Sequence, residues 1–248
     1  MDNVLLKEHG EVALVRLNNG VTNSLTAKLV EELAQVLDFV KHRFKGMVLA
    51  GGEKFFSMGF DIPSLLKGSQ EEMTQYFKNI NQVWLDLYTL PVPTVAAVKA
   101  HAIAGGTIFA IMCDWRVAAK GRTLLGLNEI KLGVPVPYLS DLVLRQLTGE
   151  RTADEIVFMG EFLDSGQALE AGLVDQVAEK GQVEELALEK VAQLAAQPAP
   201  AFQEIKSMRV ERIAALYKKN HEQRHAKFLE MWCADKTRPI LEEAAKKF

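Results

Sequence analysis

The segment His101–Gly133 reads HAIAGGTIFAIMCDWRVAAKGRTLLGLNEIKLG and decides how the rest of the chain is interpreted. An apolar run before it, Thr94–Val98, predicts a strand, and a second apolar run, Thr107–Cys113, predicts a buried helix. The glycines Gly105 and Gly106 lie between the two. The first N–H groups of a helix have no intrahelical partner, and with the helix dipole they attract negative charge. Glycine at this junction lets a ligand approach the backbone closely.

Glu129 is the one carboxylate in the apolar phrase LNEIKLG of the same segment. Backbone donors for an anion and a half-buried carboxylate together are what proton abstraction beside a carbonyl requires. Each feature also has an ordinary interpretation, because AGG after a strand usually forms only a tight turn and a single Glu is usually solvated. These two features alone therefore raise a hypothesis that the rest of the chain has to support.

The composition is that of an ordinary soluble globular protein. The chain has 248 residues, is 48% hydrophobic and 25% charged, and carries a net charge of −3, which excludes a global cationic field for nucleic acid. Two isolated cysteines indicate neither a disulfide framework nor a metal site. No stretch approaches the ~18 consecutive apolar residues of a membrane span, and the N-terminus lacks the apolar region of a signal peptide. We therefore expect a cytoplasmic protein without a metal.

Strands and helices alternate along the first ~195 residues, which predicts an α/β fold with right-handed crossovers. A hairpin is expected from Val4–Leu17, a short buried strand at Gly46–Ala50 and a long amphipathic helix at Glu71–Leu90. Ser24 is expected to cap the helix that follows it, and Ser165 a short helix that ends before Gly172.

The C-terminal part is entirely helical in pattern. After Pro198 and Pro200 we expect three helices, at about 200–219, 221–233 and 237–247. Their apolar residues need another surface, either the chain's own core or other subunits, and contiguous apolar faces favour oligomerisation. The division expected is thus a core, residues 1–197, that binds substrate and catalyses, and a helical oligomerisation region, residues 198–248.

Four blocks, in order, resemble the crotonase, or enoyl-CoA hydratase/isomerase, superfamily. The blocks are GGEKFFSMGFDI, PVPTVAAVKAHAIAGGTIFAIMCDWRVAA, LGLNEIKLG and MGEFLDSGQALEAGLVDQVA. The resemblance covers nearly the whole core, Asn18–Ala178, and implies a spiral of ββα units with a C-terminal helical trimerisation region. It also implies a homotrimer or a dimer of trimers, and an acyl-CoA or acyl-carrier-protein thioester as the binding partner, with no nucleic acid and no membrane. Coenzyme A or phosphopantetheine would be part of the substrate, so no separate cofactor is expected.

The resemblance assigns roles to individual residues. Two backbone N–H groups, those of Phe60 and Gly105, would form an oxyanion hole for the thioester oxygen, worth about 3–4 kcal/mol each by analogy with other oxyanion holes. Glu129 would be the catalytic base, with its pKa raised by an apolar pocket of Ile108, Ile111 and Leu127. The remaining substrate-binding positions expected are Ser24, Leu25, Ser57, Met58 and Ile108.

One departure from the family pattern separates the reactions. Hydratases of this family use two glutamates, but the place of the first is occupied here by Ile108, which cannot transfer protons. The phrase GLNE-x-x-LG instead resembles single-glutamate Δ3,Δ2-enoyl-CoA isomerases, in which one carboxylate suffices for a 1,3-proton shift. Two alternatives stay open: a dehydratase or decarboxylase of a CoA or carrier-protein thioester, of the polyketide β-branching type, and a non-catalytic binding protein.

Several nearby polar residues have structural interpretations. We expect Asp61 to cap a helix that begins near Pro63, and Asp114 to cap the junction between a helix and a strand. His101 is expected to be a satisfied structural histidine, although a histidine near the cavity is also a plausible proton carrier.

Overall fold

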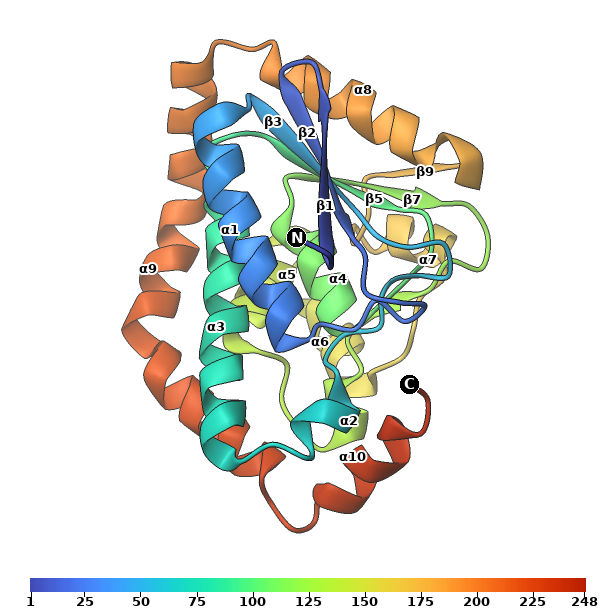
Figure 1. Ribbon diagram of the computed structural model, residues 1–248, viewed down its shortest axis with the longest axis vertical. Coiled ribbons are helices and arrows are strands. Elements are labelled where there is room, and N and C mark those ends of the chain that lie inside the picture. The colour runs from blue at the N-terminus through green and yellow to red at the C-terminus, as the bar shows by residue number, and fades with distance from the viewer.

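The computed structural model describes residues 1–248 and is organised around two sheets (Figure 1). The larger sheet has the strand order β1-β2-β3-β5-β7-β9, and all of its neighbours are parallel except the hairpin β1–β2. The smaller sheet has the order β4-β6-β8 and is parallel throughout. The strands are β1 Val4–His9, β2 Val12–Leu17, β3 Gly46–Ala50, β4 Phe55–Ser57, β5 Thr94–Val98, β6 His101–Ile103, β7 Trp115–Ala119, β8 Leu125–Gly126 and β9 Gln176–Ala178.

The chain passes repeatedly from the larger sheet to the smaller sheet and then into a helix. β3 is followed by β4 and by α2 and α3, β5 by β6 and α4, and β7 by β8 and η1. This repeat is the spiral of ββα units that the sequence predicted. The helices are α1 Ala27–Arg43, α2 Ile62–Leu65, α3 Gln70–Tyr88, α4 Gly105–Met112, α5 Tyr138–Thr148, α6 Glu150–Met159, α7 Ser165–Glu170, α8 Val183–Ala195, α9 Ala199–Trp232 and α10 Arg238–Ala245, with 3-10 turns η1 Glu129–Leu132 and η2 Lys180–Gln182.

Both faces of the larger sheet are covered. Alternate residues of β3 and β5, such as Val48 and Val95, pack against α8, while their neighbours Met47 and Ala96 belong to the main core with α1, α3 and α4. Figure 1 shows α8 on one side of the sheet and the long helices on the other. Burial on both faces explains why these strands are continuous apolar runs rather than alternating ones.

The two serine caps that the sequence predicted are wrong. α1 begins after Thr26, whose side chain accepts a hydrogen bond from the Leu29 N–H, whereas the Ser24 hydroxyl bonds the Thr22 hydroxyl at 2.7 Å. α7 is capped by Asp164, whose carboxylate accepts from the Gln167 N–H. In both cases the residue that caps the helix lies within two positions of the one that was expected.

The C-terminal region differs from the three helices that were expected. α9 runs without interruption from Ala199 to Trp232, because no Gly or Pro interrupts it near position 220. The Asn220 side chain bonds the Leu216 carbonyl one turn earlier and so stays within the helical pattern. The region therefore contains one long helix and the short α10.

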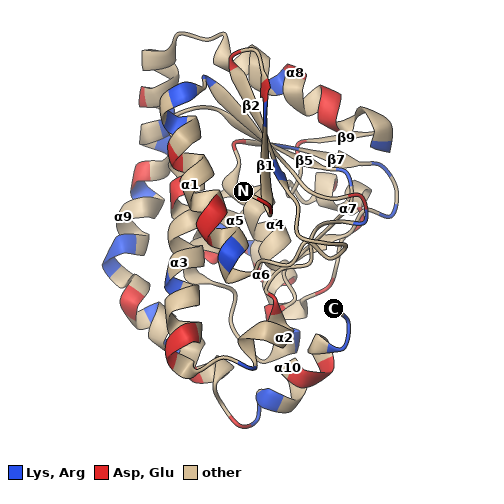
Figure 2. Cartoon of the chain, viewed as in Figure 1, with Lys and Arg blue, Asp and Glu red and all other residues tan.

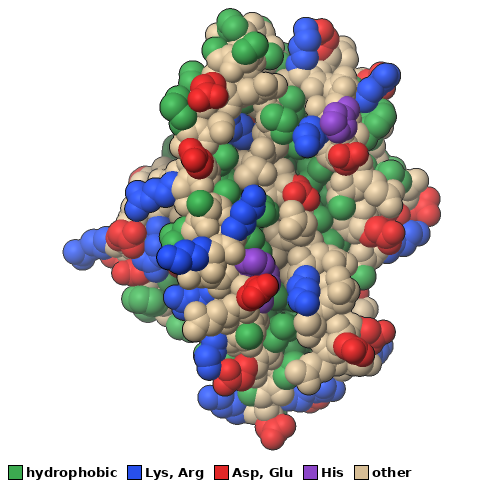
Figure 3. Space-filling view, turned by 90° about the vertical axis from the view of Figure 1, so that its left-hand side faces the viewer, with side chains coloured by type: hydrophobic (Ala, Val, Ile, Leu, Met, Phe, Trp, Pro, Cys, Tyr) green, Lys and Arg blue, Asp and Glu red, His purple; other side chains and the backbone are tan.

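α9 packs against the core of its own chain and also exposes apolar side chains. Val210, Ile213 and Tyr217 are buried against the core, whereas Ile205 and Met208 are 64% and 61% exposed. Charges of both signs lie along α9 (Figure 2), and the space-filling view of this side of the molecule shows hydrophobic side chains between charged ones (Figure 3). The expected need for a second surface is thus met partly within the chain, and some apolar side chains of α9 stay exposed.

A buried ion cluster fixes the first half of α9 to the core. The ammonium of Lys206 lies 2.7 Å from Asp114 and also donates to the Val92 carbonyl, and Arg209 contacts the second oxygen of the same carboxylate. The Asp114 carboxylate also accepts from the Thr94 N–H at the start of β5. The Asp114 and Lys206 side chains are only 8% and 4% exposed, so the pair is shielded from water. Burial lowers the pKa of Lys206, and the charge of Asp114 opposes that effect.

We expect the substitution Asp114→Ala to destabilise the protein by about 3–5 kcal/mol, because it leaves a buried ammonium without its counter-charge. Urea unfolding followed by circular dichroism would measure the change. The control is Glu243→Ala, which removes the exposed partner of Lys246 and should produce no measurable change. Equal midpoints for the two variants would contradict the anchoring role of Asp114.

No helix in the structure combines the length and the apolar character needed to cross a membrane.

Candidate active site

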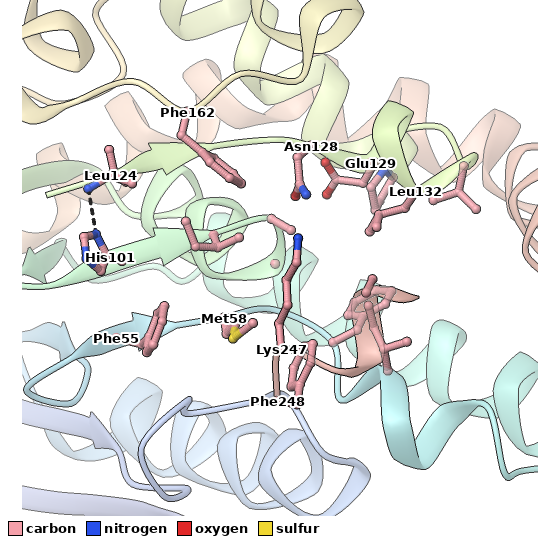
Figure 4. Close-up of a pocket in the computed structure, with 18 of the residues that line it drawn as sticks. Phe55, Met58, His101, Leu124, Asn128, Glu129, Leu132, Phe162, Lys247 and Phe248 are labelled. Carbon is pink, nitrogen blue, oxygen red and sulfur yellow. Dashed lines mark hydrogen bonds between the residues drawn. The ribbon is translucent and has the colours of Figure 1, made fainter. Parts of the chain in front are cut away.

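A largely apolar cavity of about 320 Å³ lies where the smaller sheet, η1 and the C-terminal helices meet (Figure 4). Such a volume falls in the range of small-molecule sites. Of its 20 lining residues, 14 are hydrophobic, and they come from segments far apart in the sequence. The lining residues are Phe55, Met58, Phe60, Ile62, His101, Ile103, Ala104, Gly105, Leu124, Asn128, Glu129, Leu132, Val134, Pro137, Phe162, Phe228, Trp232, Ala244, Lys247 and Phe248.

The two backbone donors predicted from the sequence meet at this cavity. The Phe60 N–H makes no hydrogen bond within the protein, and Gly105 is the first residue of α4, where an N–H has no intrahelical acceptor. The two turns are in contact, since a Cβ added to Gly59 would lie 3.1 Å from the Gly105 nitrogen. The structure therefore brings the turns that carry the Phe60 and Gly105 N–H groups together at the cavity.

The backbone at these donors is held in an uncommon conformation. Ala104 has φ 47° and ψ −113°, which a non-glycine residue rarely adopts. α4 also packs closely on β4, since a Cβ on Gly106 would lie 2.3 Å from the Ser57 carbonyl oxygen. Gly59 has φ +91°, and its carbonyl accepts from the Leu25 N–H at 2.8 Å. Strain of this kind persists only where the surrounding contacts enforce it.

Glu129 is the first residue of η1 and is only 6% exposed. Its Oε2 atom is buried without a hydrogen-bond partner, and burial raises the pKa of the carboxyl to about 7. A carboxylate with this pKa can accept a proton and return it near neutral pH. The predicted direction of the pKa shift is confirmed, and the cavity that surrounds Glu129 is lined by residues such as Leu132 and Val134.

Among the expected substrate-binding residues, only Met58 lines the cavity. Ser57 and Leu25 are fully buried beside the Met58–Phe60 turn, and the Ser57 hydroxyl accepts from the Gly59 N–H at 3.1 Å. Ser24 lies next to Leu25, outside the cavity lining. Leu25 and Ser57 hydrogen-bond to Gly59 in this turn, whereas the Ser24 hydroxyl bonds Thr22, so none of the three lines the cavity.

The expectation that Ile108 lines the substrate pocket is wrong for this structure. Ile108 is 1% exposed and belongs to the hydrophobic core, as do Ile111 and Leu127. The physical reason is that Ile108 lies within α4, which is buried along its whole length. Glu129 is the only carboxylate side chain in the lining.

His101 has the structural role that was expected for it. Its Nδ1 accepts a hydrogen bond from the Leu124 N–H at 3.1 Å, and its ring packs on Phe55 with centroids 5.6 Å apart. Partial burial, with a smaller contribution from Arg122, lowers its pKa, which favours the neutral ring. Asp61 occupies the cap position of α2, as predicted, but its side chain makes no capping hydrogen bond.

The lining residues from the C-terminal region were not predicted as site residues. Phe228 and Trp232 close one side of the cavity, and both rings pack on Phe60 with centroids 6.4 and 6.2 Å apart. Lys247 and Phe248, beyond α10, also contribute to the lining. The aromatic residues of α9 were visible in the sequence, but nothing local indicated that they return to the site. Residues 198–248 therefore help to build the cavity as well as offering an exposed apolar surface.

The family model described as enoyl-CoA hydratase/isomerase matches residues 7–241. Human mitochondrial enoyl-CoA delta isomerase 1 is 32% identical to this chain, and the match covers 79% of this chain and 67% of the human protein. Enoyl-CoA delta isomerase 3 of Arabidopsis thaliana is also 32% identical, and that match covers 70% of this chain and 76% of the Arabidopsis protein. The crystal structure of human mitochondrial Δ3-Δ2-enoyl-CoA isomerase superposes with a TM-score of 0.94 at 28% identity, covering 99% of this chain and 97% of the other.

The family model and the superposition extend over the spiral and the C-terminal helices alike, and the cavity is lined by Phe60, Gly105 and one carboxylate side chain, that of Glu129. The chain belongs to the enoyl-CoA hydratase/isomerase family, the crotonase superfamily, and is an enzyme of that family.

Proposed function

We propose that the protein is an acyl-CoA isomerase that moves the double bond of a 3-enoyl thioester to the 2-trans position. The observation that carries the proposal is that Glu129 is the only carboxylate side chain lining a cavity that also presents the Phe60 and Gly105 donors. The isomerase names of the relatives support the same reaction. No cofactor is proposed beyond the CoA or phosphopantetheine that the substrate carries.

In the proposed mechanism, the thioester oxygen accepts hydrogen bonds from the N–H groups of Phe60 and Gly105. Glu129 removes a proton from C2, and the electron pair of the broken C–H bond spreads into a dienolate whose negative oxygen the two donors stabilise. Glu129 then returns the proton to C4, which places the double bond between C2 and C3. One carboxyl group performs both proton transfers, so the reaction consumes no water and needs no second acid.

The direct test is to incubate the purified protein with 3-hexenoyl-CoA and, separately, with crotonyl-CoA, and to follow both by ultraviolet absorbance. The proposal expects conversion of the first substrate to the conjugated 2-enoyl thioester. If the protein leaves 3-hexenoyl-CoA unchanged and hydrates crotonyl-CoA, it is a hydratase and the proposed isomerase activity is wrong. The same pair of assays with a pantetheine thioester would show whether the adenosine part of CoA is needed.

We expect hydration of crotonyl-CoA to be at least ~10²-fold slower than isomerisation, because a second positioned proton carrier contributes about 10²–10⁴-fold and no second carboxylate side chain lines the cavity. The measurement is the ratio of the two kcat/KM values. Ile108→Glu should not create an efficient hydratase, since Ile108 is 1% exposed and a carboxylate there would be buried in the core. Similar rates for the two substrates would contradict the single-carboxylate mechanism.

We also propose that the protein is a trimer, or a dimer of trimers, because apolar side chains of α9 such as Ile205 and Met208 remain exposed in one chain. Light scattering should give at least three times the 27.6 kDa of a single chain. Deletion of residues 200–248 should give insoluble protein, because it uncovers the core surface that Phe228 and Trp232 cover. A monomer mass at micromolar concentration would contradict the assembly.

A further inference from the structure

Asn128 occupies a helix-cap position without acting as a cap. It immediately precedes η1, with φ −102° and ψ 20°, and its side chain makes no capping hydrogen bond. Asparagine at such a position usually accepts a hydrogen bond from an N–H of the first turn. Here the side chain lines the cavity instead (Figure 4). Asn128 lacks the hydrogen bond that asparagine usually makes at a cap position, which indicates that its side chain has a function in the cavity.

Two oxygen atoms beside each other in the sequence lack hydrogen-bond partners. Asn128 Oδ1 and Glu129 Oε2 are both buried, and neither has a donor within the protein. In Figure 4 the ends of the two side chains point toward one another at the edge of the cavity. Buried polar atoms without partners are rare in native proteins, and each needs a physical reason.

A single proton would satisfy both atoms. While Glu129 is ionised, its Oε2 and the Asn128 Oδ1 are both acceptors and cannot bond each other. Once Glu129 has taken a proton, its O–H becomes a donor and Asn128 Oδ1 becomes its acceptor. An amide that turned its Nδ2–H₂ to Glu129 would bond the ionised carboxylate instead, so the direction of the pKa change in a variant without the amide decides between the two orientations. With Oδ1 facing Oε2, the pair is complementary only in the protonated state, which is the state that Glu129 enters in the middle of the proposed reaction.

We infer that Asn128 is a positioning residue that holds the proton on Glu129 between its removal from C2 and its delivery to C4. This inference rests on the proposed isomerisation. The C2–H bond breaks and an O–H bond forms at Oε2, while the electron pair stays with the dienolate. The O–H donates to Asn128 Oδ1 until it breaks and the C4–H bond forms. The hydrogen bond retains the substrate-derived proton, which would otherwise exchange with water.

The other ionisable side chains of the cavity do not offer this contact. His101 uses its Nδ1 to accept from the Leu124 N–H, and Lys247 forms no ion pair or hydrogen bond with Glu129. Burial is the main cause of the raised pKa of Glu129, and the bond to its own N–H acts in the opposite direction. No charged neighbour is therefore needed to keep Glu129 protonated near neutral pH.

The first experiment measures the free protein and does not depend on turnover. The pKa of Glu129 is followed by carbon NMR of protein labelled at the glutamate carboxyl carbons, with the signal assigned by its loss in Glu129→Gln. Because an acceptor for the O–H stabilises the neutral acid, Asn128→Ala should lower the pKa from about 7 by about one unit. The matched control, Leu132→Ala, also enlarges the cavity but removes no acceptor. A lower pKa of Glu129 in this variant would therefore report only the entry of water. An unchanged or higher pKa in Asn128→Ala, or an equal fall in Leu132→Ala, would overturn the hydrogen bond.

The second experiment follows the proton itself. A 3-enoyl-CoA carrying deuterium at C2 is converted in ordinary water, and the deuterium that reaches C4 is measured by mass spectrometry. Wild type should transfer a substantial part of the label, and Asn128→Ala should transfer at most half as much. The control is Asn81→Ala, because Asn81 Oδ1 is also buried without a partner but lies in α3, outside the cavity lining.

The outcomes separate the inference from the proposed function. If wild type converts the substrate but transfers no label, or if Asn128→Ala transfers as much as wild type, the holding role is wrong while the isomerase stands. If wild type converts no 3-enoyl substrate, the proposed function fails, and the proton-holding role fails with it. The NMR titration then still reports whether the Asn128–Glu129 hydrogen bond exists.

Discussion

Glu129→Gln should lower the turnover of a 3-enoyl-CoA by at least ~10³-fold while leaving the binding of CoA thioesters nearly intact. A positioned base contributes about 10²–10⁴-fold, and here one group both removes and returns the proton, so both transfers lose their carrier. Glutamine keeps the size of the side chain and much of its hydrogen bonding. The measurement is kcat for isomerisation with CoA-thioester binding measured in parallel, which separates lost chemistry from lost affinity.

The controls for this prediction are His101→Gln and Asp61→Asn. His101 bonds the Leu124 N–H and Asp61 makes no capping bond, so each should cost less than tenfold. The mechanism would be wrong if Glu129→Gln kept more than a tenth of the wild-type rate, or if His101→Gln lost as much. In wild type, kcat/KM should rise with pH around 7, because the base has to be ionised and burial raises the pKa of Glu129 to about 7.

Glu129→Gln should also stabilise the folded protein at alkaline pH. The pKa of Glu129 rises from 4.5 to about 7 on folding, so the native state holds the proton more tightly than the unfolded state. Stability therefore falls as pH rises from about 4.5 to 7, and above pH 7 the buried charge costs on the order of 3 kcal/mol. Glu129→Gln should therefore raise the free energy of unfolding by most of this amount above pH 8 and by almost nothing below pH 4.5. Urea unfolding at the two pH values would measure the difference.

Gly59→Ala should lower kcat/KM by about 10²–10³-fold, the usual cost of losing one oxyanion-hole donor. The new methyl group would lie 3.1 Å from the Gly105 nitrogen and 3.1 Å from the Ile103 carbonyl oxygen. It would therefore separate the two turns that present the Phe60 and Gly105 N–H groups. The φ of +91° at Gly59 adds a backbone penalty for any side chain.

A matched control separates strain from the loss of the donor. Gly10 in the β1–β2 hairpin has φ +62°, but a Cβ there would meet nothing within 4 Å. Gly10→Ala should therefore destabilise the protein to a similar degree and leave kcat/KM unchanged. If Gly59→Ala loses stability like Gly10→Ala and keeps its activity, the paired donors are not an oxyanion hole.

The fold was largely predictable because its signals are local. The apolar runs Gly46–Ala50 and Thr94–Val98 became central strands, since each is buried on both faces. A break between two helices was expected near position 220, where α9 is continuous. Asn220 only weakly disfavours a helix, and its side chain bonds within the helix. The cap of α1 moved from Ser24 to Thr26 because two good cap residues lie close together.

The site was predictable in part, and the division has a physical basis. The glycines of the two turns are visible in the sequence, the family resemblance named Phe60 and Gly105 within those turns, and both residues line the cavity. The cavity walls depend on which distant segments pack together, so Phe228 and Trp232 could not be assigned to the site. Ile108 was placed correctly in α4, but the helix is buried all round and the side chain does not reach the cavity.

The unbroken α9 makes the C-terminal region part of the cavity. Its first half is tied to the core by Lys206 and Asp114, and its far end supplies Phe228 and Trp232 to the cavity. At about 1.5 Å of rise per residue, the 34-residue helix is roughly 50 Å long measured along its axis. In exchanging parts between members of this family, α9 has to be transferred together with the Met58–Phe60 turn it packs on. A chimera joined at Pro198 would combine two halves of one binding site that were never fitted to each other.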